Sequence, residues 1–172
     1  MKHIFIINPT AGKSDSRQRI YDMADALRTR HDLDVQCILT KRQGHATELA
    51  KKLCQTGEEL RFYACGGDGT VNEVASVLAG TGAAMGILPF GTGNDFSQAL
   101  QIPQDTAGAV AALLSAAPRR VDAARANDAF FVNVSGFGFD VDVVRYTEKY
   151  KKRFNGCLLY TSPSPRDMRR SR

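Results

Sequence analysis

The sequence predicts an α/β fold, in which a mainly parallel, doubly wound sheet carries flanking helices on both faces. Three observations lead to this prediction. Short apolar segments alternate along residues 1–122 with segments of helical period. The connections between these segments are short, as they are in βαβ units. Two glycine-rich turns each follow an apolar segment and precede a helical one, which is typical of ligand-binding turns in parallel sheets.

The first four elements alternate strand and helix. Residues 3–9, "HIFIINP", are short, apolar and β-branched, which favours a buried strand. Residues 14–30 follow as a helix, in which Ile20, Met23, Ala24 and Leu27 recur at helical spacing on one face. Residues 33–40 are the second expected strand. Residues 44–57 are the second expected helix, with a glycine at its end.

The next five elements continue the alternation and surround the glycine turns. Residues 60–65 form a strand that enters the first turn, and residues 71–80 leave it as a helix. Residues 83–90 form a strand that enters the second turn, and residues 94–100 leave it as a short helix. Residues 105–118 form a further helix, with Asp105 as its N-cap and Pro118 at its end.

The pattern changes after residue 122, which we take as the end of the α/β domain. Asn127-Asp128 lies between two strand-like runs and predicts an antiparallel hairpin. A helical pattern follows at residues 138–154, so we expect residues 123–156 to begin a second, truncated β domain. Residues 157–172 show no period and are rich in Ser, Pro and Arg, which predicts a disordered or non-native tail.

Composition argues against a nucleic-acid partner and against a membrane-spanning segment. The net charge is +5, but residues 157–172 hold four Arg and one Asp, which leaves 19 basic and 17 acidic residues in the body. No apolar run approaches the roughly 18 residues that a spanning helix needs. The N-terminus does not resemble a signal peptide, so we expect a cytoplasmic protein. Cys37, Cys54, Cys65 and Cys157 lack metal-site spacing and are expected to be reduced, mostly buried thiols.

The glycine turns indicate a phosphate-binding edge. Gly66, Gly67 and Gly69 in the first turn, and Gly91 and Gly93 in the second, remove side chains where a helix begins. A helix N-terminus offers unpaired N–H groups and partial positive charge, so phosphate could bind directly to the backbone. The second turn, "GTGNDF", is not a dinucleotide fingerprint, because it ends in Phe and follows the fourth strand.

Asp68 and Asp95 lie within these turns and need an explanation. A carboxylate beside phosphates is repulsive unless a cation lies between them, and Mg²⁺ is commonly held by one or two carboxylates together with phosphates. The pair therefore favours a Mg²⁺–nucleotide site. The alternative is that each aspartate only caps a turn or a helix, and the sequence leaves both interpretations open.

A third loop, "NPTAGKS" at residues 8–14, follows the first strand. It lacks the first glycine of a Walker A motif, because Ile7 stands at that position. Lys13 could still reach a phosphate as a point charge, or it could simply be solvated.

Four motifs, "NPTAGK", "ACGGDGTVNEV", "GILPFGTGNDF" and "NVSGFGFDVDVV", together resemble the diacylglycerol kinase catalytic-domain family, over residues 2–156. The resemblance implies a lipid kinase that uses ATP and Mg²⁺ and phosphorylates a diacylglycerol-like lipid hydroxyl at the inner membrane surface. A homodimer is left open. The nucleotide-binding residues that it implies are Asn8, Pro9, Thr10, Ala11, Gly12, Lys13, Thr40, Gly66, Gly67, Asp68, Gly69, Thr70, Val71, Asn72, Glu73, Gly91, Thr92, Gly93 and Asn94. The metal-organising residues that it implies are Asp68, Asp95 and Asp122.

One feature of this family is missing from the chain. The family's general base is an aspartate in the second domain, in a segment like Leu-Asp-Gly-Glu, and no such segment is present. We therefore expect the chain alone to hold the ATP-binding part and to be inactive. Two alternatives stay open, an NAD kinase-like enzyme and a nucleotide-binding module without catalysis.

Overall fold

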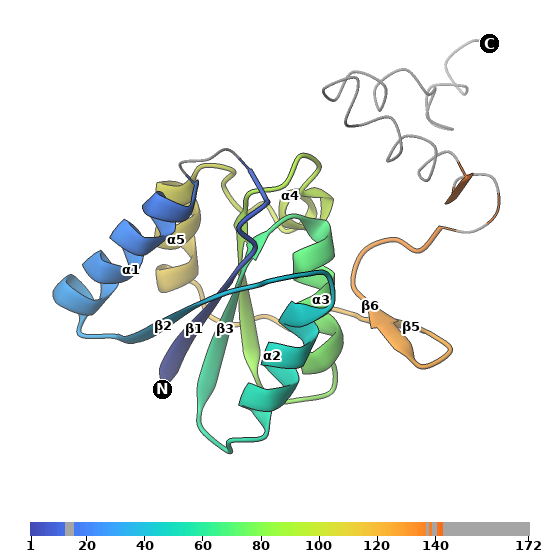
Figure 1. Ribbon diagram of the computed structural model, residues 1–172, viewed down its shortest axis with the longest axis horizontal. Helices are drawn as coiled ribbons and strands as arrows, with labels where there is room; N and C mark the ends of the chain where they lie inside the picture. Colours follow the sequence, from blue (N-terminus) through green and yellow to red (C-terminus); the bar gives the residue numbers. More distant parts are fainter. Residues whose placement is uncertain (13–15, 137, 139–140, 143–172) are drawn as a thin grey trace, which may run out of the picture. The chain divides into compact units, whose positions relative to one another are not determined.

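The computed structural model of this chain describes residues 1–12, 16–136, 138 and 141–142. Its centre is a parallel sheet with strand order β2-β1-β3-β4 (Figure 1). The strands are β1 (Lys2–Ile7), β2 (Asp34–Leu39), β3 (Leu60–Gly66) and β4 (Ala84–Pro89). All three pairings are parallel, which confirms the predicted sheet. In the part of the chain described, β2 and β4 each pair with a single strand and form the two edges of this sheet.

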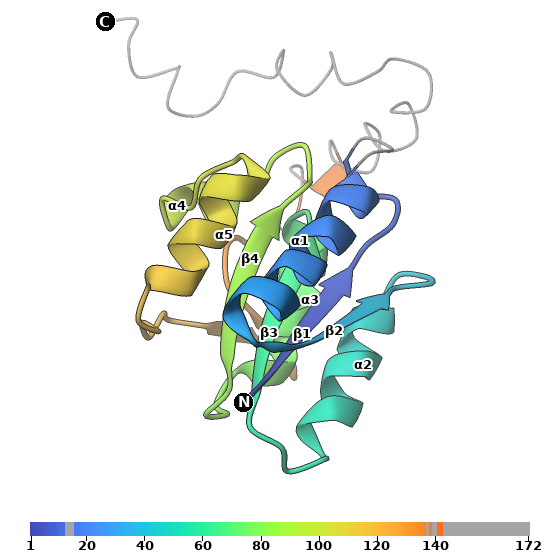
Figure 2. The ribbon, with the colours of Figure 1, turned by 90° about the vertical axis from the view of Figure 1, so that its left-hand side faces the viewer.

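Helices cover both faces of the sheet, as expected for a doubly wound fold. They are α1 (Ser16–His31), α2 (His45–Cys54), α3 (Asp68–Leu78), α4 (Asp95–Ala99) and α5 (Thr106–Ser115). Figure 2 shows α1 and α5 side by side on one face, and Figure 1 shows α2 and α3 together on the other. The fold class predicted from the sequence is therefore confirmed.

Alternating side chains of β1 divide the core into two layers. Ile4 and Ile6 pack among residues of α2 and α3, while Phe5 and Ile7 pack among residues of α1 and α5. All four side chains are buried, because β1 lies between two strands and beneath helices on both faces. This explains why the segment is an unbroken apolar run.

One element boundary differs from the prediction in a way that affects the site. The helix expected to begin at residue 71 begins at Asp68, with Gly67 as its N-cap. An aspartate at the first helical position is favourable, because its charge opposes the positive end of the helix dipole. Much of the first glycine turn is therefore the first turn of α3.

The helix α5 has the N-cap that the sequence predicts. The carboxylate of Asp105 accepts a hydrogen bond from the backbone N–H of Gly108 at 2.7 Å. The helix ends at Ser115, shortly before Pro118.

The expected hairpin is present, but it belongs with the first compact unit. β5 (Ala124–Ala126) and β6 (Ala129–Phe131) pair in antiparallel fashion, and Asn127 in the turn has a φ of 53°. One compact unit comprises residues 1–133 and a second comprises residues 134–172. The helix expected at 138–154 lies almost entirely outside the described residues, and the tail at 157–172 lies wholly outside them.

The cysteines differ in exposure. Cys65 is buried, Cys37 is half-buried and Cys54 is exposed, which corrects the expectation for Cys54, while Cys157 lies outside the described residues. Among the helices that the structure describes, none combines the length and the apolar character needed to cross a bilayer.

Candidate functional site

The candidate site lies at the carboxyl edge of the sheet, where loops leave all four strands. Backbone hydrogen bonds join these loops to neighbouring strands. The N–H of Asn8 donates to Cys65 O at 2.9 Å, the N–H of Thr40 to Ile7 O at 2.8 Å and the N–H of Phe90 to Gly66 O at 2.9 Å. The chain leaves β1 toward β2 and later continues outward from β3 to β4, so the strand order reverses between β1 and β3. Ligands of open α/β sheets bind at such a reversal.

The two glycine turns touch each other at this edge. A Cβ atom on Gly91 would lie 2.5 Å from Gly67 Cα, and one on Gly67 would lie 3.1 Å from Gly91 Cα. Both obstacles are backbone atoms, which cannot move aside as a flexible side chain could. The absence of side chains at Gly67 and Gly91 therefore lets the two turns pack directly together.

The other glycines have different surroundings. A Cβ on Gly66 would collide with the side chain of Thr70, at 2.5 Å from its Oγ1. A Cβ on Gly69 would meet nothing within 4 Å. Packing therefore explains the glycine at 66, 67 and 91, but it does not explain the glycine at 69.

Asp68 and Asp95 face a common space beside Gly93. The Cβ position of Gly93 lies 3.3 Å from Asp68 Oδ2 and 3.6 Å from Asp95 Oδ1. The other oxygen of Asp68, Oδ1, accepts a hydrogen bond from the backbone N–H of Phe96 in α4 at 3.1 Å. Asp68 thus caps the helix of the second turn with one oxygen and leaves Oδ2 beside Asp95.

Asp122 does not join this pair in a metal site. It is exposed in the segment between α5 and β5. Within the described residues, no group of three His, Cys, Asp or Glu side chains has an arrangement that could hold a metal ion. The expected trio of aspartates is therefore not assembled in this structure, whereas two of its members lie near each other.

Asn94 shapes the second turn through its own side chain. Its Oδ1 accepts from the N–H of Gly91 at 2.8 Å, and its Nδ2 donates to Gly91 O at 2.9 Å. Its backbone is left-handed, with a φ of 54°. Nδ2 also donates to Gln104 Oε1 at 3.3 Å, a residue that the sequence analysis did not identify. Thr92 and Gly93 are exposed at the tip of this turn.

The first loop is joined to α3 by a side-chain bond. Asn8 Nδ2 donates to Thr70 Oγ1 at 3.3 Å, and Asn8 Oδ1 accepts from the N–H and the hydroxyl of Thr10 at 3.0 and 2.8 Å. Gly12 has a φ of 76°, which explains the glycine there. Pro9 and Ala11 of the same loop are half-buried. Lys13 lies outside the described residues.

Two of the predicted nucleotide-contact residues have side chains that pack or bond within the protein. Val71 is buried in the core beneath α3. Glu73 accepts hydrogen bonds from the backbone N–H groups of Gly44 and Ala46, at the start of α2, at 2.9 and 3.1 Å. Thr40 is buried at the end of β2, and Asn72 is half-buried. The capping role of Glu73 was missed, although α2 begins without a Ser, Thr, Asp or Asn to cap it.

Burial raises the pKa of a thiol at this edge. Cys65, at the end of β3, is fully buried, and burial raises the pKa of its thiol well above the ordinary value of 9.0. The thiol therefore stays protonated and is unsuited to act as a nucleophile.

Comparison with known proteins identifies the family. Residues 2–126 match the family model of the diacylglycerol kinase catalytic domain. The chain belongs to the diacylglycerol kinase catalytic-domain family. The residues matched include all four loops of the carboxyl edge.

Several bacterial proteins resemble this diacylglycerol kinase family member. It is 32% identical to a diacylglycerol kinase of Staphylococcus haemolyticus, over 90% of the chain and 47% of the relative. It is 35% identical to a probable YegS-like lipid kinase of Klebsiella pneumoniae, over 87% of the chain and 50% of the relative. A crystal structure described as a diacylglycerol kinase of Bacillus anthracis superposes with a TM-score of 0.66 at 30% identity, covering 85% of this chain and 52% of that one. The chain thus spans about half the length of the relatives it matches.

Proposed function

We propose that the chain is the nucleotide-binding part of an ATP-dependent lipid kinase, which transfers the γ-phosphoryl group of ATP to the hydroxyl of a diacylglycerol-like lipid. The observation that carries this proposal is the contact between Gly67 and Gly91, which brings Asp68 and Asp95 to one space at the strand-order reversal. Membership of a kinase family supports the reaction class.

The nucleotide would bind along the carboxyl edge of the sheet. α3 begins in the first glycine turn and presents unpaired N–H groups there, and Gly69 leaves its backbone uncovered. The loops that start at Asn8, Thr40 and Gly91 surround this helix end. Among the predicted contact residues, Thr70, Val71 and Glu73 would contribute backbone or loop geometry, because their side chains bond or pack within the protein.

A Mg²⁺ ion fits the donor set of the two turns. Asp68 Oδ2 and Asp95 Oδ1 are carboxylate oxygens near the same open position, and Mg²⁺ is commonly held by one or two carboxylates plus phosphates and water. These two residues would hold the ion. The bound ion would neutralise phosphate charge that the carboxylates otherwise repel.

Phosphoryl transfer between such groups depends mainly on positioning and electrostatic stabilisation. The glycine turns of this chain would hold the phosphates. The hydrogen bonds of Asp68 and Asn94 described above would keep these turns in one conformation. The base that accepts the hydroxyl proton, and most lipid contacts, would come from the half of the relatives that this chain does not span. The basic segment 149–154, a candidate for contact with anionic head groups, lies outside the described residues.

A chimera tests the proposal. Residues 1–133 are joined to the C-terminal half of the Staphylococcus haemolyticus relative, and the chimera is supplied with radiolabelled ATP and either diacylglycerol vesicles or NAD. We expect labelled lipid, no labelled NAD and no product from the same chimera carrying Asp68→Asn. Labelling of NAD alone would point to an NAD kinase-like enzyme. ATP binding without either product would point to a non-catalytic module.

A further inference from the structure

Three side chains in the first half of α3 each bond to a different loop of the carboxyl edge. Asp68 accepts from the N–H of Phe96 after the second glycine turn. Thr70 accepts from the side chain of Asn8 in the first loop. Glu73 accepts from the loop that joins β2 to α2. α3 therefore sets the positions of all three other loops.

The carboxylate of Glu73 caps the N-terminus of α2, which has no side-chain cap of its own. The N-cap residue of α2 is Gly44, which has a φ of 80° and no side chain with which to cap the helix. Glu73 supplies both acceptors from another helix, with Oε1 on Gly44 and Oε2 on Ala46. Its negative charge also opposes the positive end of the α2 dipole. Thr47 adds a third link, since its hydroxyl donates to the backbone oxygen of Glu73 at 3.2 Å.

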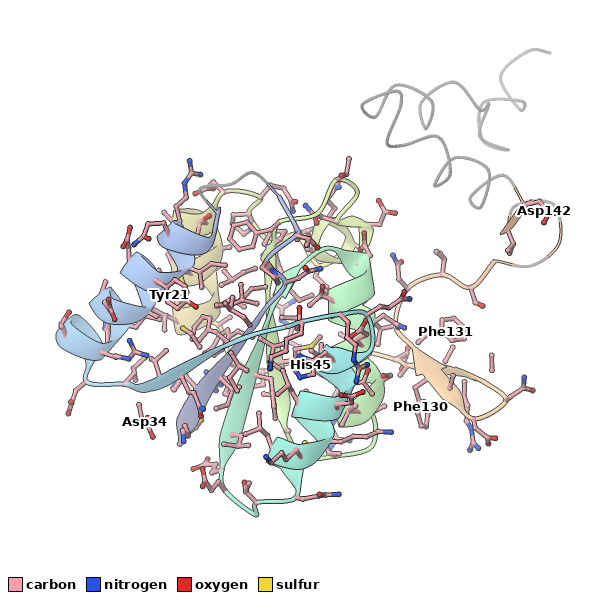
Figure 3. All side chains as sticks on the ribbon, viewed as in Figure 1. Tyr21, Asp34, His45, Phe130, Phe131 and Asp142 are labelled. Atoms are coloured by element: carbon pink, nitrogen blue, oxygen red, sulfur yellow. The ribbon has the colours of Figure 1, made fainter. Side chains whose placement is uncertain are left out.

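This cap holds one end of the loop at residues 40–44. The other end is held by β1, through the bond from the N–H of Thr40 to Ile7 O. Inside the loop, the N–H of Lys41 donates to His45 Nδ1 at 3.1 Å, and the N–H of His45 donates to Arg42 O at 3.2 Å. Figure 3 shows His45 at the start of α2. With both ends held, Thr40 and Lys41 keep one position relative to the glycine turns.

We propose that Glu73 is a positioning residue for the nucleotide site. It does not touch the ligand, and it acts through the backbone of Gly44 and Ala46 to hold the loop at 40–44 against α3. This inference rests on the proposed function of the site. It assigns to Glu73 a role different from the direct nucleotide contact that the family motif implied.

Amide hydrogen exchange of the full chain tests the structural half of the inference. The variant Glu73→Ala removes both acceptors, and we expect exchange at Gly44 and Ala46 to accelerate at least about tenfold. Glu73→Gln keeps one acceptor and should give an intermediate effect. Glu58→Gln, the same charge change at an exposed position, is the control and should leave both amides unchanged. Unchanged exchange in Glu73→Ala would overturn the inference.

Titration with ATP, with and without Mg²⁺, tests the functional half. We expect Glu73→Ala to raise the Kd about three- to tenfold, by the same factor in both conditions, because the lost contact lies in the protein and not at the metal. Ile87→Val, a buried substitution in β4, should lower the melting temperature while leaving the Kd unchanged. This variant separates loop positioning from a general loss of stability.

The outcomes distinguish the inference from the proposed function. An unaltered chain that binds neither ATP nor ADP would overturn the proposed function, and this inference with it. A chain that binds ATP with the same Kd before and after Glu73→Ala would overturn the inference alone. A loss of affinity confined to the Mg²⁺ condition would also overturn it, because that pattern indicates direct participation of the carboxylate.

Discussion

Gly67 and Gly91 lie in contact at the carboxyl edge of the sheet, and each occupies space that a side chain on the other would need. Gly69 belongs to the same motif as Gly67, yet open space surrounds its Cβ position. Packing therefore explains the glycine at 67, whereas for the glycine at 69 the reason to be tested is the ligand contact proposed above.

Substitution by alanine should separate these two reasons. Gly91→Ala places a methyl group 2.5 Å from Gly67 Cα, and we expect it to lower the free energy of unfolding by about 1–3 kcal/mol. Gly69→Ala replaces a helical glycine in open space and should raise the free energy of unfolding by up to about 1 kcal/mol. Urea denaturation measures both.

Nucleotide affinity completes that comparison. If phosphate approaches the bare backbone at Gly69, Gly69→Ala should bind ATP more weakly although it folds more stably. Equal affinity for ATP in Gly69→Ala and the unaltered chain would remove the ligand explanation for that glycine.

One carboxylate oxygen of Asp68 caps α4 and the other faces Asp95. Two substitutions should separate the effects of these two oxygens. Asp68→Asn keeps an oxygen that can accept from Phe96, so we expect a stability change below about 0.5 kcal/mol and a loss of Mg²⁺-dependent ATP affinity. Asp68→Ala also removes the cap and should lower the free energy of unfolding by about 0.5–2 kcal/mol. Thermal unfolding and calorimetric titration give the two readouts. Full Mg²⁺-dependent affinity in Asp68→Asn would show that the charge has no role.

At the scale of elements, α3 shows what local sequence could and could not predict. Its apolar spacing predicted a helix, and its register against the sheet follows from Val71, Val74 and Leu78. Its start at Asp68 was not predicted, because glycines have low helix propensity and the capping geometry depends on the neighbouring turn. The bonds of α3 to three loops depend on residues far apart in the chain, and periodicity carries no information about such pairs.

The pairing of β1 with β3 buries a titratable group at the end of the sheet opposite the site. His3 Nδ1 lies 2.8 Å from the hydroxyl of Tyr63, whose ring stacks on Phe5 with 4.3 Å between centroids. Burial, and to a lesser extent the nearby Arg61 charge, lower the pKa of His3 below its ordinary value of 6.5.

This lowered pKa predicts a dependence of stability on pH. Between the folded-state pKa and 6.5, the unfolded chain binds more protons at His3 than the folded chain does. Stability should therefore fall as the pH drops below 6.5 and should stop falling, as far as His3 contributes, below the folded-state pKa. Melting temperatures between about pH 8 and about pH 5 measure this slope. His3→Gln should flatten the dependence of melting temperature on pH, whereas His31→Gln, at an exposed position, should leave it unchanged. Equal slopes in the unaltered chain and both variants would contradict the role given to His3.

At the scale of the whole molecule, the sequence predicted the order of strands and helices along the chain and the parallel sheet that they form. The alternation of buried strands and helices was sufficient, because each element carries its own periodicity. The packing of the hairpin β5–β6 against α3 was not predicted, since the sequence signals an antiparallel pair but gives no sign of what the pair contacts. In Figure 3, Phe130 and Phe131 project from opposite sides of β6, so the apolar pattern alone did not indicate which of them faces a neighbour.

This chain spans about half the length of its relatives, which leads to a prediction for the isolated protein. We expect it to bind ATP, more weakly than the chimera does, and to phosphorylate diacylglycerol at a negligible rate, because the expected base lies in the other half. Radiolabelled ATP with lipid vesicles measures the rate. Robust lipid phosphorylation by the isolated chain, abolished by Asp68→Ala, would show that the first half contains its own base.

The outer edge of β4 has a consequence for how this chain behaves at high concentration. In the described part of the molecule, one side of β4 has no partner strand, and its sequence AMGILP carries no charge that would discourage pairing with another chain. A cavity of about 610 Å³ runs beside it, lined by apolar side chains such as Met85 and Ile87 and also by Arg61, Arg119 and Arg120. Isolated chains should therefore associate edge to edge, and Met85→Lys should suppress that association in sedimentation measurements at several protein concentrations.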